Sequence, residues 1–82
     1  MEIKVLGSGC ANCKRLYAEV EKAVAQTGQP ATITKVESME EIASSGILRT
    51  PGLVIDGKIV SSGRIPGASE IATMITTALA KA

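Results

Sequence analysis

The spacing of apolar residues changes several times along the chain, and each change predicts a different element. Alternating polar and apolar residues over 2–6 predict a strand that ends at Gly7-Ser8-Gly9. Apolar residues three and four positions apart then predict a helix over about 10–27, which Gly28 and Pro30 end. Residues 31–36 are β-branched, and a slip in their alternation predicts an edge strand or a bulge.

A short second helix is predicted in the segment after residue 37, which is rich in glutamate. Ser38 and Glu41 have the spacing of a capping box, with Ser38 as N-cap and Glu41 at the third helical position. We expect this helix to end at Gly46. The apolar residues that it is expected to bury are Met39, Ile42 and Ala43.

The last third of the chain predicts a hairpin and a final helix. Residues 53–55 are continuously apolar, which is typical of a central strand covered on both faces. Asp56-Gly57 is a strong hairpin dipeptide and leads into a strand over 58–60. A last helix after Gly67 places four apolar residues on one stripe, namely Ile71, Ile75, Ala78 and Leu79.

The predicted order is βαβαββα, an α/β fold with a mixed four-stranded sheet flanked by three helices. The first two strands are joined through a helix and should be parallel, whereas the hairpin strands must be antiparallel. The chain has 82 residues, which favours one domain over 1–82.

Composition narrows the range of functions. The net charge is +1, and the chain has one Tyr but no Phe or Trp, so a nucleic-acid partner is disfavoured. There is no His to act as a base or a metal ligand. No apolar run approaches the roughly 20 residues of a membrane span, and the first residues lack the pattern of a signal peptide. We therefore expect a cytoplasmic protein that binds no membrane.

The only two cysteines, Cys10 and Cys13, lie where a strand gives way to a helix. A structural disulfide across so short a loop would constrain the unfolded chain little, and the cytosol would reduce it. The start of a helix favours an anion, so we expect an exposed Cys10 thiolate that attacks disulfides. Cys13, one turn later, should be more buried and resolve the mixed disulfide.

A thiophilic metal ion is the main alternative for the same pair. Two thiolates suit Cu(I) or an arsenical, and a strand, CxxC and helix also open the heavy-metal-associated domain of copper chaperones. That domain usually carries a Met before its first Cys, where this chain has Gly7-Ser8-Gly9, and its order is βαββαβ. Zinc would need four ligands, which one chain does not supply. Two inert thiols in a core would explain neither the spacing nor the position.

A second motif, Thr50-Pro51-Gly52, precedes the apolar strand. Together with the cysteine pair and Gly63-Arg64, it resembles the thioredoxin-like superfamily, and most closely the small "redox-active disulfide" proteins of archaea and bacteria. The resemblance runs nearly end to end. It implies Cys10 as nucleophile, Cys13 as resolving thiol and Pro51 as a cis-proline that faces them. It also implies that the Thr50 backbone binds an extended substrate and that Gly63 lets substrate approach.

The resemblance implies a thiol–disulfide oxidoreductase that uses its own dithiol, with no cofactor and no metal. Its substrates would be disulfides in proteins or small molecules, and an upstream reductase of unknown identity would return electrons to Cys10 and Cys13. We expect a monomer. The motif lacks a Trp before Cys10 and a Pro between the cysteines, so the redox poise of thioredoxin does not carry over. No glutathione site is recognisable.

Overall fold

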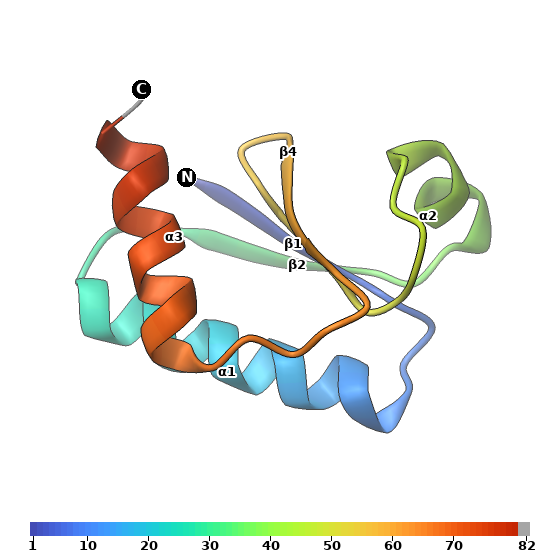
Figure 1. Cartoon of the computed structure of the whole chain (residues 1–82), viewed down its shortest axis with the longest axis horizontal. Coiled ribbons are helices and arrows are strands. Elements are labelled where there is room, and N and C mark those ends of the chain that lie inside the picture. The colour runs from blue at the N-terminus through green and yellow to red at the C-terminus, as the bar shows by residue number, and fades with distance from the viewer. Residues whose placement is uncertain (81–82) are drawn as a thin grey trace.

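A computed structural model describes residues 1–80 and confirms the predicted order of elements (Figure 1). The helices and strands are β1 (Glu2–Leu6), α1 (Ala11–Thr27), β2 (Thr32–Val36), α2 (Met39–Ser45), β3 (Gly52–Ile55), β4 (Lys58–Ser62) and α3 (Ala68–Ala80). The fold is α/β, with one mixed four-stranded sheet and three helices, as the sequence predicts.

The strand order in the sheet is β2-β1-β3-β4. β1 pairs in parallel with β2 and antiparallel with β3, and β3 and β4 form the antiparallel hairpin. β2 is therefore an edge strand, which explains its weak alternation. The irregularity in the register lies in the hairpin instead: Val54 pairs with Ile59 and Leu53 with Ser61, so Val60 is the extra residue of a bulge.

The hairpin turn is built from Asp56 and Gly57, whose φ angles are +48° and +82°. Two successive positive φ angles are what a two-residue hairpin turn of type I′ requires. Asp56 also binds the first strand, because the Glu2 backbone N–H donates to Asp56 Oδ1 at 2.8 Å and the Asp56 N–H donates to the Glu2 carbonyl at 2.8 Å. The tip of the hairpin is thus fastened to the start of β1.

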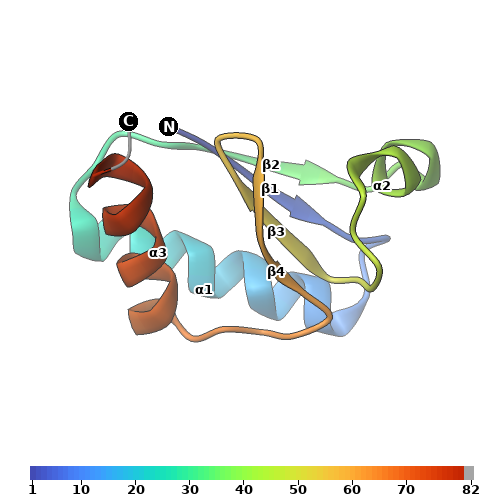
Figure 2. The same cartoon turned by 45° about the horizontal axis from the view of Figure 1, so that its top comes forward.

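One face of the sheet carries the larger core. Helices α1 and α3 pack against each other and against this face (Figure 2). The stripe predicted for α1 is confirmed, since the residues that it buries recur at helical spacing. The buried residues of this core are Ile3, Val5, Leu16, Val20, Ala23, Leu53, Ile55, Ile71 and Ile75.

The opposite face has a smaller core formed by Leu6, Val36, Ile42 and Val54. Of the helices in residues 1–80, α2 is the one that covers it, at one end of the sheet (Figure 1). Ser38 caps this helix as predicted, because its Oγ accepts the Glu41 N–H at 3.4 Å.

Two burial predictions were wrong, and one residue of the apolar stripe predicted for the last helix is exposed. Met39 is 69% exposed and Ala43 is also exposed, because the seven residues of α2 bring only Ile42 onto the sheet. Leu79 is 40% exposed, because it lies in the last turn of α3, where the helix extends beyond α1 (Figure 1). Ile71 and Ile75, earlier in the same stripe, are buried as predicted.

Within residues 1–80, none of the helices combines the length and the apolar character needed to cross a membrane.

Candidate active site

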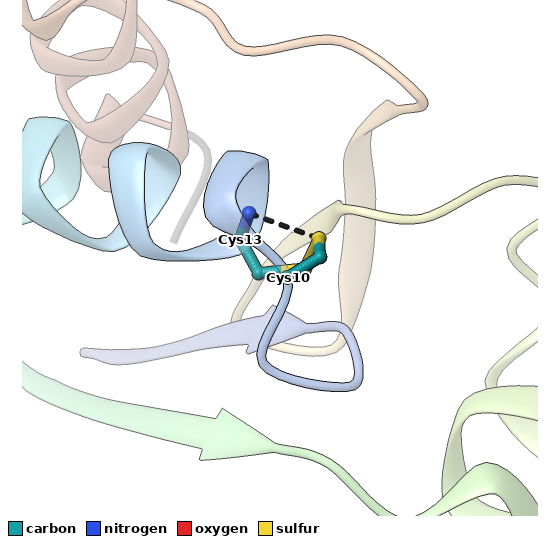
Figure 3. The surroundings of a disulfide bond; sticks show 2 residues. All are labelled: Cys10 and Cys13. Carbon is teal, nitrogen blue, oxygen red and sulfur yellow. Dashed lines mark hydrogen bonds between the residues drawn. A yellow bond between two sulfur atoms is a disulfide. The ribbon is translucent and has the colours of Figure 1, made fainter.

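Cys10 and Cys13 lie at the start of α1, directly after the turn that leaves β1 (Figure 3). Cys10 is the N-cap residue and is exposed, whereas Cys13 lies one turn into the helix and is only 6% exposed. Their Cα atoms are 5.1 Å apart and their sulfurs form a disulfide. The predicted contrast between an accessible and a buried cysteine is present.

The helix directs a hydrogen-bond donor at the accessible sulfur. The backbone N–H of Cys13 donates to Cys10 Sγ at 3.2 Å, the bond that an N-cap side chain normally receives (Figure 3). The unpaired N–H groups of the first helical turn also place partial positive charge at this end. Both effects favour negative charge on the Cys10 sulfur.

Gly7 forms the wall behind the disulfide. A Cβ at this position would overlap Cys13 Sγ and would lie 3.2 Å from Cys13 Cβ. The backbone of Gly7 is fixed, because its N–H donates to the Val36 carbonyl at 2.9 Å. The absence of a side chain at Gly7 is therefore what leaves room for the buried sulfur. Sequence reasoning treated Gly7 only as the end of a strand.

The Thr50–Pro51 peptide bond is cis, as the resemblance predicts. Pro51 is buried next to Gly7, the residue behind the disulfide. Its Cα lies 3.9 Å from the position that a Cβ on Gly7 would take. Its carbonyl accepts the Gly63 N–H at 2.9 Å, and Thr50 is exposed. The three segments that the sequence singled out are thus brought together at one end of the sheet.

The space over Gly63 is occupied by the side chain of Arg49, to which sequence reasoning assigned no role. Gly63 has a φ of +74°, and a Cβ built on it would lie 2.9 Å from Arg49 Cβ and 3.1 Å from Arg49 Cδ. The alkyl part of Arg49 therefore lies across the Gly63 backbone. No pattern in the sequence pairs these two residues.

A cavity of about 60 Å³ adjoins the buried cysteine. This volume is sufficient for ordered water. Lys35 reaches into this region from β2, with its Nζ 4.6 Å from the centre of the Tyr17 ring. The residues that line the cavity are Val5, Gly7, Gly9, Cys13, Lys14, Tyr17, Lys35 and Glu37.

Metal-ligating side chains do not gather elsewhere in the part of the chain that the structure describes. Over residues 1–80, no group of three or more His, Cys, Asp or Glu side chains is placed to hold a metal ion. The cysteine pair alone provides two thiolates.

A mixed sheet with CxxC at a helix start and a cis-proline beside it defines a thioredoxin-like thiol–disulfide oxidoreductase. The chain belongs to the thioredoxin domain family, whose model matches residues 1–76. It is 34% identical over 76 residues to a thioredoxin of Methanothermobacter thermautotrophicus, covering 93% of this chain and 99% of that protein. It is 42% identical over 69 residues to a thioredoxin of Methanocaldococcus jannaschii, covering 84% and 79% respectively. These matches favour the oxidoreductase over the metal carrier.

Proposed function

We propose that Cys10 is the nucleophile and Cys13 the resolving thiol of a dithiol that reduces substrate disulfides. The observation that carries this assignment is the difference between the two sulfurs. Cys10 is exposed and its sulfur accepts the Cys13 N–H, whereas Cys13 is almost fully buried. An exposed thiol stabilised as thiolate is the group that attacks.

In the first step the Cys10 thiolate attacks one sulfur of the substrate disulfide. A bond forms between Cys10 Sγ and that sulfur, the substrate S–S bond breaks, and the other substrate sulfur leaves as a thiolate. In the second step the Cys13 thiolate attacks Cys10 Sγ. The Cys10–Cys13 disulfide forms and the remaining substrate sulfur leaves, so two electrons have passed to the substrate.

We further propose that the Thr50 backbone pairs with an extended substrate segment beside the disulfide. Thr50 is exposed and directly precedes Pro51, which lies against the Gly7 wall. A substrate strand paired here would place its own sulfur near Cys10, a small case of β-augmentation. A substrate that contacts Gly63 would share that space with the Arg49 side chain.

The proposed cycle needs no cofactor besides the cysteine pair. A separate reductase must supply a dithiol or its equivalent to convert the disulfide back to two thiols. We propose a reducing cytoplasm as the compartment, a monomer as the working form and disulfide-containing proteins as substrates, in keeping with the family.

Single cysteine variants test the two roles. With Cys13→Ser, we expect the first step to proceed and the second to fail, so that substrate proteins accumulate as mixed disulfides on Cys10. With Cys10→Ser, we expect no reductase activity and little trapping. Mass spectrometry of the trapped adducts identifies the linked cysteine.

Alkylation of the reduced protein at neutral pH provides an independent measurement. Cys10 should be modified well before Cys13, because it is exposed and favoured as thiolate. Equal labelling of the two thiols would contradict the assignment, and faster labelling of Cys13 would reverse it.

A further inference from the structure

Arg49 and Arg64 flank the hydrogen bond between the Gly63 N–H and the Pro51 carbonyl, and they differ in what their guanidinium groups contact. Arg64 Nη2 donates to both carboxylate oxygens of Glu70 at 2.7 Å. Arg49 is exposed, and within residues 1–80 its guanidinium forms no ion pair. Arg64 is therefore already engaged, whereas Arg49 presents an available cation.

Arg49 is held in place at both its backbone and its side chain. Its N–H donates to Ser62 Oγ at 3.2 Å, and the Ser62 hydroxyl donates back to the Arg49 carbonyl at 3.1 Å. Its alkyl chain lies on the Gly63 backbone. Because the stem is already positioned, binding an anion costs Arg49 less conformational entropy than it would cost a free surface side chain.

The position of Arg49 relates it directly to the substrate path. Arg49 lies two residues before Pro51. The Pro51 carbonyl accepts the N–H of Gly63, and the alkyl part of the Arg49 side chain lies on Gly63. Lys14 and Arg15, directly after Cys13, also form no ion pair within residues 1–80. A carboxylate is also present near the cysteines, because Glu37 Oε2 lies 3.0 Å from the position of a Cβ on Gly9.

Next to Arg49, the side chain of Leu48 is 94% exposed. Contact with another polypeptide would cover this side chain, whereas a small hydrophilic disulfide would leave it in water. A polypeptide that pairs with Thr50 would pass both residues.

Building on the proposed function, we propose that Arg49 is a specificity-determining residue that selects substrates with an acidic residue beside the reactive cysteine. Its guanidinium would donate hydrogen bonds to the carboxylate of an Asp or Glu in an extended polypeptide segment. A planar guanidinium binds a carboxylate through two parallel hydrogen bonds, which gives direction as well as charge. The preference acts on substrate recognition and leaves the sulfur chemistry unchanged.

The test uses two disulfide-bonded peptides that differ only in whether Glu or Gln lies next to the target cysteine. At low ionic strength, the wild-type protein should reduce the Glu peptide with a higher kcat/KM, by up to about fivefold, which is the upper end of the range for an exposed ion pair. The advantage should shrink in ~1 M salt, where charges are screened within about 3 Å.

Variants at position 49 identify the source of the preference. Arg49→Gln should bring the ratio close to one, and Arg49→Glu should favour the Gln peptide. Lys58→Gln is the matched control, because Lys58 is an exposed cation at the far end of β4 and forms no ion pair within residues 1–80. It should keep the wild-type ratio and activity.

The outcomes separate this inference from the proposed function. If both peptides are reduced with a ratio that Arg49→Gln leaves unchanged, the inference is wrong and the oxidoreductase assignment survives. If neither peptide is reduced, both fail. Glutathione disulfide and hydroxyethyl disulfide form a second pair, with and without carboxylates. An Arg49-dependent preference confined to that pair would assign the site to small molecules and overturn the polypeptide inference.

Discussion

The two faces of the sheet differ in how many apolar side chains are buried against them. The face under α1 and α3 buries nine apolar side chains in one cluster, whereas the face under α2 buries four. Buried apolar area is the main source of folding free energy. We infer that α1 and α3 hold the fold, and that α2 is attached by much less.

The loop that we propose binds substrate, residues 46–51, follows the helix on the face with the smaller core. α2 ends at Gly46, and the chain then runs through Leu48 and Arg49 to Pro51 beside the disulfide. The cysteines, in contrast, begin α1 and are fixed by the larger core. Elements that bind partners often come from the less stable parts of a protein. The cysteines thus begin a helix of the larger core, whereas the loop that leads to Pro51 follows a helix attached by the smaller core.

The largest loss of free energy of unfolding should come from a substitution in the larger core. Leu16 is completely buried in α1, so Leu16→Ala removes contacts and leaves a cavity. We expect it to lower the free energy of unfolding by about 2–5 kcal/mol, measured by urea denaturation. Gln26→Ala, at an exposed position of the same helix, should change it by less than about 0.5 kcal/mol.

An intermediate loss of free energy of unfolding is expected from Ile42→Ala, which removes the side chain that packs α2 against the sheet. Ile42 is 6% exposed and is the only buried residue of α2. The loss should be near the lower end of the range, about 2 kcal/mol. Hydrogen exchange should accelerate chiefly over residues 39–50 and little in α1. A loss equal to that of Leu16→Ala, with exchange rising everywhere, would mean that both faces are equally coupled to the fold.

The smallest effect is expected at Met39, the residue that periodicity placed in the core. Met39→Ala removes a side chain that is 69% exposed. The free energy of unfolding should change by less than about 0.5 kcal/mol. A loss above about 1 kcal/mol in urea denaturation would show that α2 docks on its Met39 side after all.

The elements themselves were predictable because their signals are local. Helix caps at Ser38 and Gly28, the Asp56-Gly57 turn and the change from alternation to helical spacing each act within a few residues. The position of the cysteine pair at a helix start followed from the same signals. The cis bond before Pro51 did not; it came from resemblance to a family.

The remaining features depend on residues distant in the sequence. Periodicity shows which side of α2 is apolar, but the size of the opposing surface decides how much of that side is buried, and here only Ile42 reaches it. The overlap of a Gly7 side chain with Cys13 and the placement of Arg49 on Gly63 arise from tertiary packing. A single sequence contains no local pattern for such contacts.

The pair of hydrogen bonds between Glu2 and Asp56 has a practical consequence for attaching the protein to a support. These bonds fix the start of β1 to the hairpin tip. The five residues of β1 then run toward the disulfide, over about 16 Å at ~3.3 Å per residue. A tether or fused domain joined ahead of Met1 would therefore leave from the end of the sheet opposite the start of α1 (Figure 1). An electrode or bead coupled there would leave the sulfurs facing the solution.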